Sequence, residues 1–410
     1  MLLGFKTELK LNKSQRVLLA QHSGTARHAW NWGNRLCLQI LENNKNNPAL
    51  KIKFPTAIDL HKWLVALVKP ENPWYYESSK CAPQYALRHL ASAWGDCFNK
   101  KKGRPKFKKK GRNDSFTLDG SIKVDHFKIQ VPKIGWLKTY ERLPQNFKPK
   151  SVTISRQADR WFVSFKIEIE SLATVKKVNV CGVDLGVKTL ATLSTGEVFI
   201  GAKSYRKLEN KLARLQRIVS RRELKSANWY KAQSKVARLH KRIADIRQDT
   251  LHKLTTYLAK NHGQIVIEDL NVSGMLANHK LAKSIADMGL FEFRRQLDYK
   301  CQLYGSELII ADRWFPSSKT CSECGCKKET LTLSDRIFKC SDCNFEIDRD
   351  LNASYNLARH CGLGGFPKEQ MSQEAKIGRA TAEFTSEEKV LPTVFVESEN
   401  KTFSLISRFE

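Results

Sequence analysis

Three carboxylates stand at the ends of apolar segments of the sequence. Asp184 directly follows an apolar strand that ends at Val183, and Glu268 directly follows the apolar run 265–267. Asp350 opens a predicted helix over residues 350–360. A carboxylate at the end of a buried strand is costly unless it is paired or binds a metal. Two such strand ends and one helix start can converge at one edge of a sheet.

Carboxylate oxygens of this kind are ligands for Mg²⁺ or Mn²⁺. Two ions about 4 Å apart could activate a water molecule and stabilise the leaving oxygen in phosphodiester hydrolysis. Taken singly, each acid is better explained as a strand-end or cap residue, and Asp350 especially so, because Asp is a favoured N-cap. The combination of two strand ends and a helix start is what favours a metal site. Neighbouring acids also compete for the role. Asp269 lies beside Glu268, and Asp348 would replace Asp350 if the helix starts earlier.

Four cysteines form two C-x-x-C pairs at a spacing typical of a zinc site. Cys321 and Cys324 make the first pair, Cys340 and Cys343 the second, with 15 residues between the pairs. Each pair offers two thiolates on one tight turn, and two pairs complete a tetrahedral site without an open position. We therefore expect one structural Zn²⁺ ion. Cys326 is a spare thiol that could compete for it.

The positive charge of the chain is concentrated in two stretches. The 410 residues include 71 Lys and Arg against 41 Asp and Glu, a formal net charge of +30. Such an excess indicates a polyanionic partner, most simply nucleic acid, and argues against a small-molecule enzyme with an ordinary surface. Nine of the 13 residues over 100–112 are basic, and residues 201–260 hold 17 Lys and Arg against four acids. Either stretch could be a solvated loop or helical hairpin, but we expect phosphate contacts. The candidates are Lys100, Lys101, Lys102, Arg104, Lys106, Lys108, Arg214, Arg217, Arg221 and Arg222.

The elements that must position these residues follow from hydrophobic periodicity. Apolar runs predict buried strands around the acids, and alternation predicts a small β-barrel or sheet over residues 115–170, which the first strand of the chain joins. Helices are expected from Ser14 toward Trp30, over 57–68, after Pro83, over 201–260 as one or two long basic helices, and over 291–304. The predicted buried strands are 178–183, 190–193, 197–200, 265–267 and 308–311.

No apolar run approaches the ~18 residues that a membrane span needs. The opening sequence MLLGFKTELK carries charges where a secretory signal would be apolar. We therefore expect a cytoplasmic protein. Residues 362–410 hold eight acids and six basic residues, and we expect a mobile tail there with one docked apolar segment.

Together these segments resemble the TnpB (OrfB) proteins of insertion sequences, compact relatives of the type V CRISPR effectors. The resemblance is carried by four motifs in order: GVDLGV at 182–187, IEDL at 267–270, PSSKTCSECG at 316–325 and DRDLNAS at 348–354. It extends to GRPKFK at 103–108 and covers about residues 1–360. Ser354 is a mild departure from the family's Asn-Ala-Ala pattern.

The resemblance implies a multidomain fold of α+β and α/β parts. Residues 1–178 would form a wedge-type β-barrel with an inserted helical recognition lobe over about 14–98. An RNase H-like RuvC nuclease domain would follow over 179–312 and end over 347–361. A zinc-ribbon insertion that binds target nucleic acid would occupy 313–346.

The activity that the resemblance implies is RNA-guided DNA cleavage. A transposon-encoded guide RNA would pair with double-stranded target DNA beside a short adjacent motif. Asp184, Glu268 and Asp350 correspond to the family's catalytic, metal-binding acids, and the four cysteines to its zinc ligands. The alternatives are a nuclease-inactive, RNA-guided repressor, a transposase that joins strands, and a zinc-stabilised RNA-binding protein.

Overall fold

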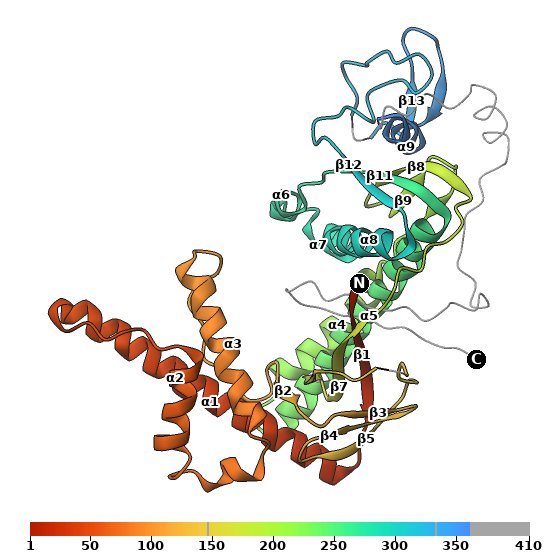
Figure 1. The fold of residues 1–410 in the computed structure, drawn as a ribbon. Helices are drawn as coiled ribbons and strands as arrows, with labels where there is room; N and C mark the ends of the chain where they lie inside the picture. The colour runs from red at the N-terminus through yellow and green to blue at the C-terminus, as the bar shows by residue number, and fades with distance from the viewer. Residues whose placement is uncertain (146, 333, 361–410) are drawn as a thin grey trace. The chain divides into compact units, whose positions relative to one another are not determined.

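Two units of the chain fold around separate sheets (Figure 1). The computed structural model describes residues 1–145, 147–332 and 334–360. One unit comprises residues 2–168, and the other begins at Ile169. None of the helices in this part of the chain is long and apolar enough to cross a membrane. The expected tail, 362–410, lies outside the described residues.

The helices of the first unit are built on one long helix. It begins after Asn12, whose side chain caps it in a capping box with Gln15. The predicted helix start is thus confirmed, but the helix continues to Asn46. Gly33 lets this helix pack closely against Leu87, because an added Cβ would lie only 2.8 Å from the Leu87 side chain. The elements are α1 (Lys13–Asn46), η1 (Pro48–Leu50), α2 (Ala57–Trp63), η2 (Leu64–Val68), η3 (Pro73–Glu77) and α3 (Cys81–Phe98).

The first strand of the chain joins the sheet of this unit, as predicted. It pairs antiparallel with β7, with Phe5 opposite Phe165, and its end pairs with β5, with Leu9 opposite Thr139. The strand order is β2-β6-β7-β1-β5-β4-β3. The strands are β1 (Leu2–Lys10), β2 (Ser115–Asp119), β3 (Lys123–Asp125), β4 (Lys128–Val131), β5 (Gly135–Thr139), β6 (Ser151–Gln157) and β7 (Arg160–Glu168).

The prediction of a closed β-barrel is wrong for the described residues. Strands β2 and β3 stand at the two ends of the order, and no pairing joins them among the described residues. Closure would require ladder hydrogen bonds along both edges, and β3 spans only three residues. The described strands therefore form an open sheet.

The second unit is built on a mixed sheet in the order β10-β9-β8-β11-β12. Its three strands β8, β11 and β12 are parallel, with Val183 opposite Ile267. Strands β8 and β11 are buried on both faces, which explains why they appear in the sequence as continuous apolar runs, whereas β12 at the sheet edge is only partly buried. Helix α9 packs on β8 and β11 around Val180, Val266 and Leu357 (Figure 1). The elements are β8 (Val178–Leu185), β9 (Ala191–Leu193), β10 (Val198–Phe199), β11 (His262–Glu268), β12 (Glu307–Ala311), β13 (Ile337–Lys339), β14 (Glu346–Asp348) and α9 (Arg349–Arg359).

The basic segment after residue 200 forms a helical hairpin, as predicted. Its helices α4 and α5 meet at Leu212, Leu239 and Ile243. Because α4 begins at Ser204 without a local cap, Asp287 supplies one: its carboxylate accepts hydrogen bonds from the Tyr205 N–H at 2.9 Å, the Arg206 N–H at 3.2 Å and the Ser204 hydroxyl at 3.1 Å. The helices are α4 (Ser204–Ser220), α5 (Ala227–Asn261), α6 (Val272–Ala277), α7 (Ala282–Met288) and α8 (Leu290–Tyr304).

We predict that Asp287→Ala lowers the free energy of unfolding by about 1–3 kcal/mol, because it leaves backbone donors of α4 without their acceptor. Urea denaturation followed by circular dichroism measures this change. Asp249 is the control, since its pair with Lys253 is exposed and its replacement by Ala should cost less than about 0.5 kcal/mol. Equal losses for the two variants would contradict the capping role.

Candidate functional site

Two of the three predicted acids leave adjacent parallel strands side by side. Val183 of β8 pairs with Ile267 of β11, so the next residues, Asp184 and Glu268, emerge together at the carboxyl ends of their strands. Burial raises the pKa of the Asp184 carboxyl well above its usual range, and the negative charges of Glu268 and Asp350 raise it further. This edge of the sheet therefore concentrates negative charge, which the Arg349 guanidinium offsets only in part.

The third acid lies in the first turn of α9. The helix begins at Arg349 and its N-cap is Asp348, which accepts hydrogen bonds from the N–H groups of Asp350 at 3.0 Å and Leu351 at 3.2 Å. Asp350 is therefore not the cap. Its own carboxylate accepts a hydrogen bond from the Arg349 guanidinium at 3.3 Å. Of the two competing acids, Asp350 raises the pKa of Asp184 more than Asp348 does.

A glycine brings α9 to the acids. A Cβ built on Gly182 would lie 1.9 Å from the Ser354 carbonyl oxygen and 2.6 Å from the Ala358 nitrogen, far inside contact distance. Only glycine lets the helix approach β8 this closely. Gly182 therefore sets the distance between α9 and the strand that carries Asp184.

Three buried polar residues that the sequence analysis did not single out hold the loop after β12. The Ser317 hydroxyl donates a hydrogen bond to the Glu268 carboxylate. The Asn356 amide donates to the carbonyl oxygens of Ser317 at 2.7 Å and Thr320 at 2.6 Å, and the Asn352 amide donates to Thr320 at 2.7 Å. A signal was present, because the two asparagines recur one helical turn apart.

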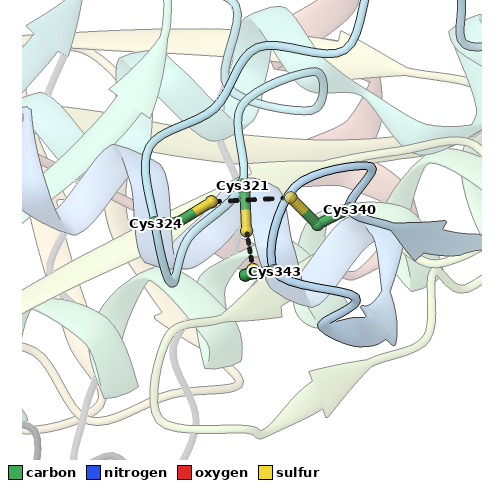
Figure 2. A group of neighbouring side chains, drawn as sticks. All are labelled: Cys321, Cys324, Cys340 and Cys343. Atoms are coloured by element: carbon green, nitrogen blue, oxygen red, sulfur yellow. Dashed lines mark hydrogen bonds between the residues drawn. The ribbon is translucent and has the colours of Figure 1, made fainter.

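The four predicted zinc ligands gather at one point (Figure 2). Their sulfur atoms all lie within 4.8 Å of one another. The Cys321–Cys343 and Cys324–Cys340 sulfur pairs are 3.7 and 3.5 Å apart. Tetrahedral Zn–S bonds of about 2.3 Å would separate neighbouring sulfurs by about 3.8 Å, so the donor set fits such an ion.

The electrostatics of the cysteine cluster favour a metal-binding thiolate at one position. Hydrogen bonds from the backbone N–H groups of Cys343 and Asp342 lower the pKa of the Cys340 thiol to about 6. Cys326 is not part of the cluster, and its interaction with Asp342 raises its thiol pKa to about 11. The structure thus separates the spare cysteine from the four.

The three acids do not gather as tightly as the cysteines. In the described part of the chain, the cysteines are the one set of three or more His, Cys, Asp or Glu side chains whose ligand atoms converge at ion-binding distances. Hydrogen bonds from Ser317 and Arg349 hold Glu268 and Asp350, respectively. The pairing of the strands and the packing of α9 bring the three acids to the same edge of the sheet. The hydrogen bonds from Ser317 and Arg349 then set the positions of two of their side chains.

The basic loop at 100–112 is fastened to α1 through its backbone. The Trp30 indole donates to the Lys106 carbonyl at 3.0 Å, Asn31 exchanges hydrogen bonds with both backbone groups of Lys108, and Asn34 donates to Pro105. The loop is therefore ordered, with most of its basic side chains exposed. Among the candidate residues, Lys102 pairs with Asp96 at 2.8 Å and Lys108 lies over the Trp30 ring at 4.0 Å. Arg214, Arg217, Arg221 and Arg222 are exposed at and beyond the end of α4.

Comparisons with known proteins give the family. Residues 164–279 match the OrfB family described as "Probable transposase", and residues 291–357 match "Cas12f1-like, TNB domain". A Streptomyces pristinaespiralis protein named "Putative RNA-guided DNA endonuclease" is 40% identical over 315 residues, covering 73% of this chain and 77% of that protein. InsQ of Escherichia coli K12, which has the same printed description, is 34% identical over 372 residues, covering 86% and 90%. The chain belongs to the TnpB (OrfB) family.

The family expected from the motifs is thereby confirmed, and a solved structure supports the fold. The chain in the "Cryo-EM structure of the Cas12f1-sgRNA-target DNA complex" is similar with a TM-score of 0.52 at 14% identity, covering 85% of this chain and 83% of that chain. Residues 1–46 match a "Helix-turn-helix domain". In this TnpB-family chain they form β1 and the single helix α1.

We predict that Gly182→Ala displaces α9, because the added methyl group would overlap the Ser354 carbonyl. Amide hydrogen exchange over residues 350–359 should become at least about tenfold faster, since packing against β8 protects this helix. Gly95 is a matched control within α3, where an added Cβ meets nothing within 4 Å. Unchanged exchange in Gly182→Ala would contradict the proposed role of the close approach.

Proposed function

We propose that this TnpB-family protein is an RNA-guided DNA endonuclease. A guide RNA pairs with target DNA next to a short adjacent motif, and one site cuts both strands in turn. The names of the relatives support the activity. The observation that carries the proposal is the raised pKa of Asp184, caused by burial and by the charges of Glu268 and Asp350. Such a group of acids at a strand edge is the environment that a divalent cation stabilises.

The chemistry assigned to the site is phosphodiester hydrolysis. Asp184, Glu268 and Asp350 would hold two Mg²⁺ or Mn²⁺ ions, which when bound supply an activated water and charge stabilisation at the leaving oxygen. Ser317 orients Glu268 through its hydrogen bond, and Arg349 offsets part of the charge of Asp350. The sequence contains no second nuclease motif, so the second strand would use the same acids.

The domain assignments follow the family. We assign residues 179–312 and 347–361 to a RuvC nuclease domain of the RNase H type, and residues 313–346 to a zinc-ribbon insertion that binds target nucleic acid. Residues 1–178 would provide the wedge, with a helical recognition lobe inserted over about 14–98. The antiparallel pair β13 and β14 next to the cysteine cluster supports the ribbon assignment.

The charged surfaces would bind the nucleic acids. Base pairing would supply most of the sequence specificity, while the protein holds backbones and recognises the adjacent duplex. The ordered loop at 100–112 and the exposed arginines of α4 are the contacts we propose for guide RNA and the RNA–DNA hybrid. Each basic side chain on a phosphate releases counterions, so binding should weaken steeply with salt.

We predict that Asp184→Asn abolishes cleavage, by about 10³-fold or more, because it removes a carboxylate that holds the metal. Guide-loaded protein should still bind its matched target. The assay is cleavage of a matched duplex in Mg²⁺ alongside a filter-binding measurement, with Asp249→Asn as the control. Cleavage that persists in Asp184→Asn would refute the assignment, and wild-type protein that binds without cutting would identify a guided repressor. Joining of transposon-end strands would identify a transposase.

The same variant should be more stable than the wild type in chelator at neutral pH. A carboxyl whose pKa is raised by folding contributes stability below its unfolded pKa, and this is lost as the pH rises through its native pKa. Asp184→Asn should therefore raise the melting temperature at pH 7.5. The difference should vanish near pH 4, which a thermal scan at both pH values tests.

The cysteine cluster should hold one zinc ion per chain. We predict that Cys340→Ser loses this zinc and melts at a lower temperature, because metal binding contributes directly to folding. Elemental analysis after mild purification measures the content. Cys97→Ser is the control, since Cys97 lies outside the cluster. Wild-type protein without zinc would overturn the site.

A further inference from the structure

A fifth cysteine lies against the four-cysteine cluster. The Cys326 side chain packs on the buried group formed by Cys321, Phe338 and Cys340. Its carbonyl oxygen accepts a hydrogen bond from the Cys321 N–H at 2.8 Å. Four thiolates complete a tetrahedral zinc site, and Cys326 is not among the four whose sulfurs converge. A thiol that the ion does not need therefore lies beside the ligand set.

Cys326 also lies next to the second cysteine pair. Its thiol interacts with the side chains of Ser341 and Asp342. These two residues stand between Cys340 and Cys343 in the sequence. A disulfide forms only between cysteines whose Cα atoms lie within about 7 Å of each other, so proximity is the first requirement for one. The contacts of Cys326 bring its thiol to the turn that carries both cysteines of the second pair.

Two of the four ligands are accessible to small molecules. Cys324 and Cys343 are exposed, whereas Cys321 and Cys340 are buried. Zinc binding keeps a cysteine in its thiolate form, and the thiolate is the form that a peroxide oxidises to a sulfenic acid. A sulfenic acid condenses with a neighbouring thiol to give a disulfide. An exposed ligand and the thiol of Cys326 thus supply the two partners of that reaction.

We propose that Cys326 is the resolving thiol of an oxidation site formed with Cys343. Hydrogen peroxide oxidises the Cys343 thiolate: an S–O bond forms, the O–O bond breaks, and the leaving oxygen takes a proton from solvent and departs as water. Cys326 then attacks the Cys343 sulfur, so that an S–S bond forms and the S–O bond breaks. The Asp342 carboxylate passes the thiol proton of Cys326 to the departing hydroxide. The two sulfurs lose two electrons in total, and the peroxide is reduced to two water molecules.

The disulfide takes one of the four ligands away from the zinc ion. Three sulfurs leave the ion with an open position, from which a chelator removes it. Loss of the ion loosens the loop of the first pair, which Asn352 holds through Thr320 and Ser322. The same loop carries Ser317, which donates a hydrogen bond to Glu268. Oxidation therefore lowers cleavage reversibly, and this consequence alone rests on the proposed nuclease function.

The first measurement maps disulfides in the zinc-loaded full chain after treatment with hydrogen peroxide. Trypsin places Cys326 in the peptide 320–327 and Cys343 in the peptide 340–349. We expect mass spectrometry to find these two peptides joined through Cys326 and Cys343, and a thiol reductant to separate them. Oxidised wild-type protein without a disulfide at Cys326 would overturn the proposal, whatever the variants do.

The second measurement follows zinc with a chromophoric chelator through oxidation and then reduction. Wild-type protein should release its zinc and bind it again after reduction, because the disulfide is reversible. Without the resolving thiol, the sulfenic acid proceeds to a sulfinic acid that a reductant does not reverse, so Cys326→Ser should recover at least about fivefold less zinc. Cys326→Ala, which keeps the apolar packing, should behave as Cys326→Ser does. Cys97→Ser is the control, since Cys97 lies outside the cluster. Equal recovery in all these proteins would contradict the role of Cys326.

Cleavage of matched duplex, measured on the same samples, separates the oxidation site from the nuclease assignment. We expect oxidised wild-type protein to cut at least about tenfold more slowly and to regain its rate after reduction with zinc present. If the wild type does not cut but the joined peptides form, the oxidation site stands and the nuclease function fails. Unchanged cleavage by fully joined protein would overturn the coupling to Glu268.

Discussion

The close approach of α9 to β8 is the contact on which the candidate site depends. Gly182 lies under Ser354 and Ala358, where any side chain would overlap the helix backbone. That one contact brings an acid of the helix to two acids at the strand ends. The charge of Asp350 raises the pKa of Asp184 because the helix lies at this distance, whereas Glu268 reaches Asp184 through the pairing of β8 with β11.

The same helix links the acids to the cysteine cluster. Asn352 and Asn356 are buried and bind carbonyl oxygens of the loop that leads into Cys321. Asn352 also accepts a hydrogen bond from the N–H of Ser322, which lies between the first two cysteines. The loop in turn carries Ser317, which donates to Glu268. These hydrogen bonds are costly to break, because they satisfy buried backbone groups. A change at the cysteine cluster would therefore be transmitted through them to Glu268.

Features that depend on local sequence could be predicted, whereas those that depend on distant partners could not. Strands β8 and β11 appeared as apolar runs because both their faces are buried, and the cysteine spacing is typical of a site for one tetrahedral ion. The continuation of α1 to Asn46 was not predicted, because the packing of Gly33 against Leu87 depends on a helix distant in the sequence. The barrel was wrong because closure depends on edge pairing, which alternation within strands does not report. Ser317 gave no signal, since its role depends on a carboxylate 49 positions away.

The arrangement of charge explains why cation-binding acids and basic surfaces can coexist in one chain. A strongly positive protein attracts polyanions, yet its candidate reaction site is a cluster of carboxylates that repels them. Arg294 and Arg313 donate hydrogen bonds to Asp269 and line the same hollow as Glu268, so positive charge lies next to this acid. The repulsion at Asp184 is relieved by its protonation or by a bound cation, so substrate and metal would each make the other's binding more favourable.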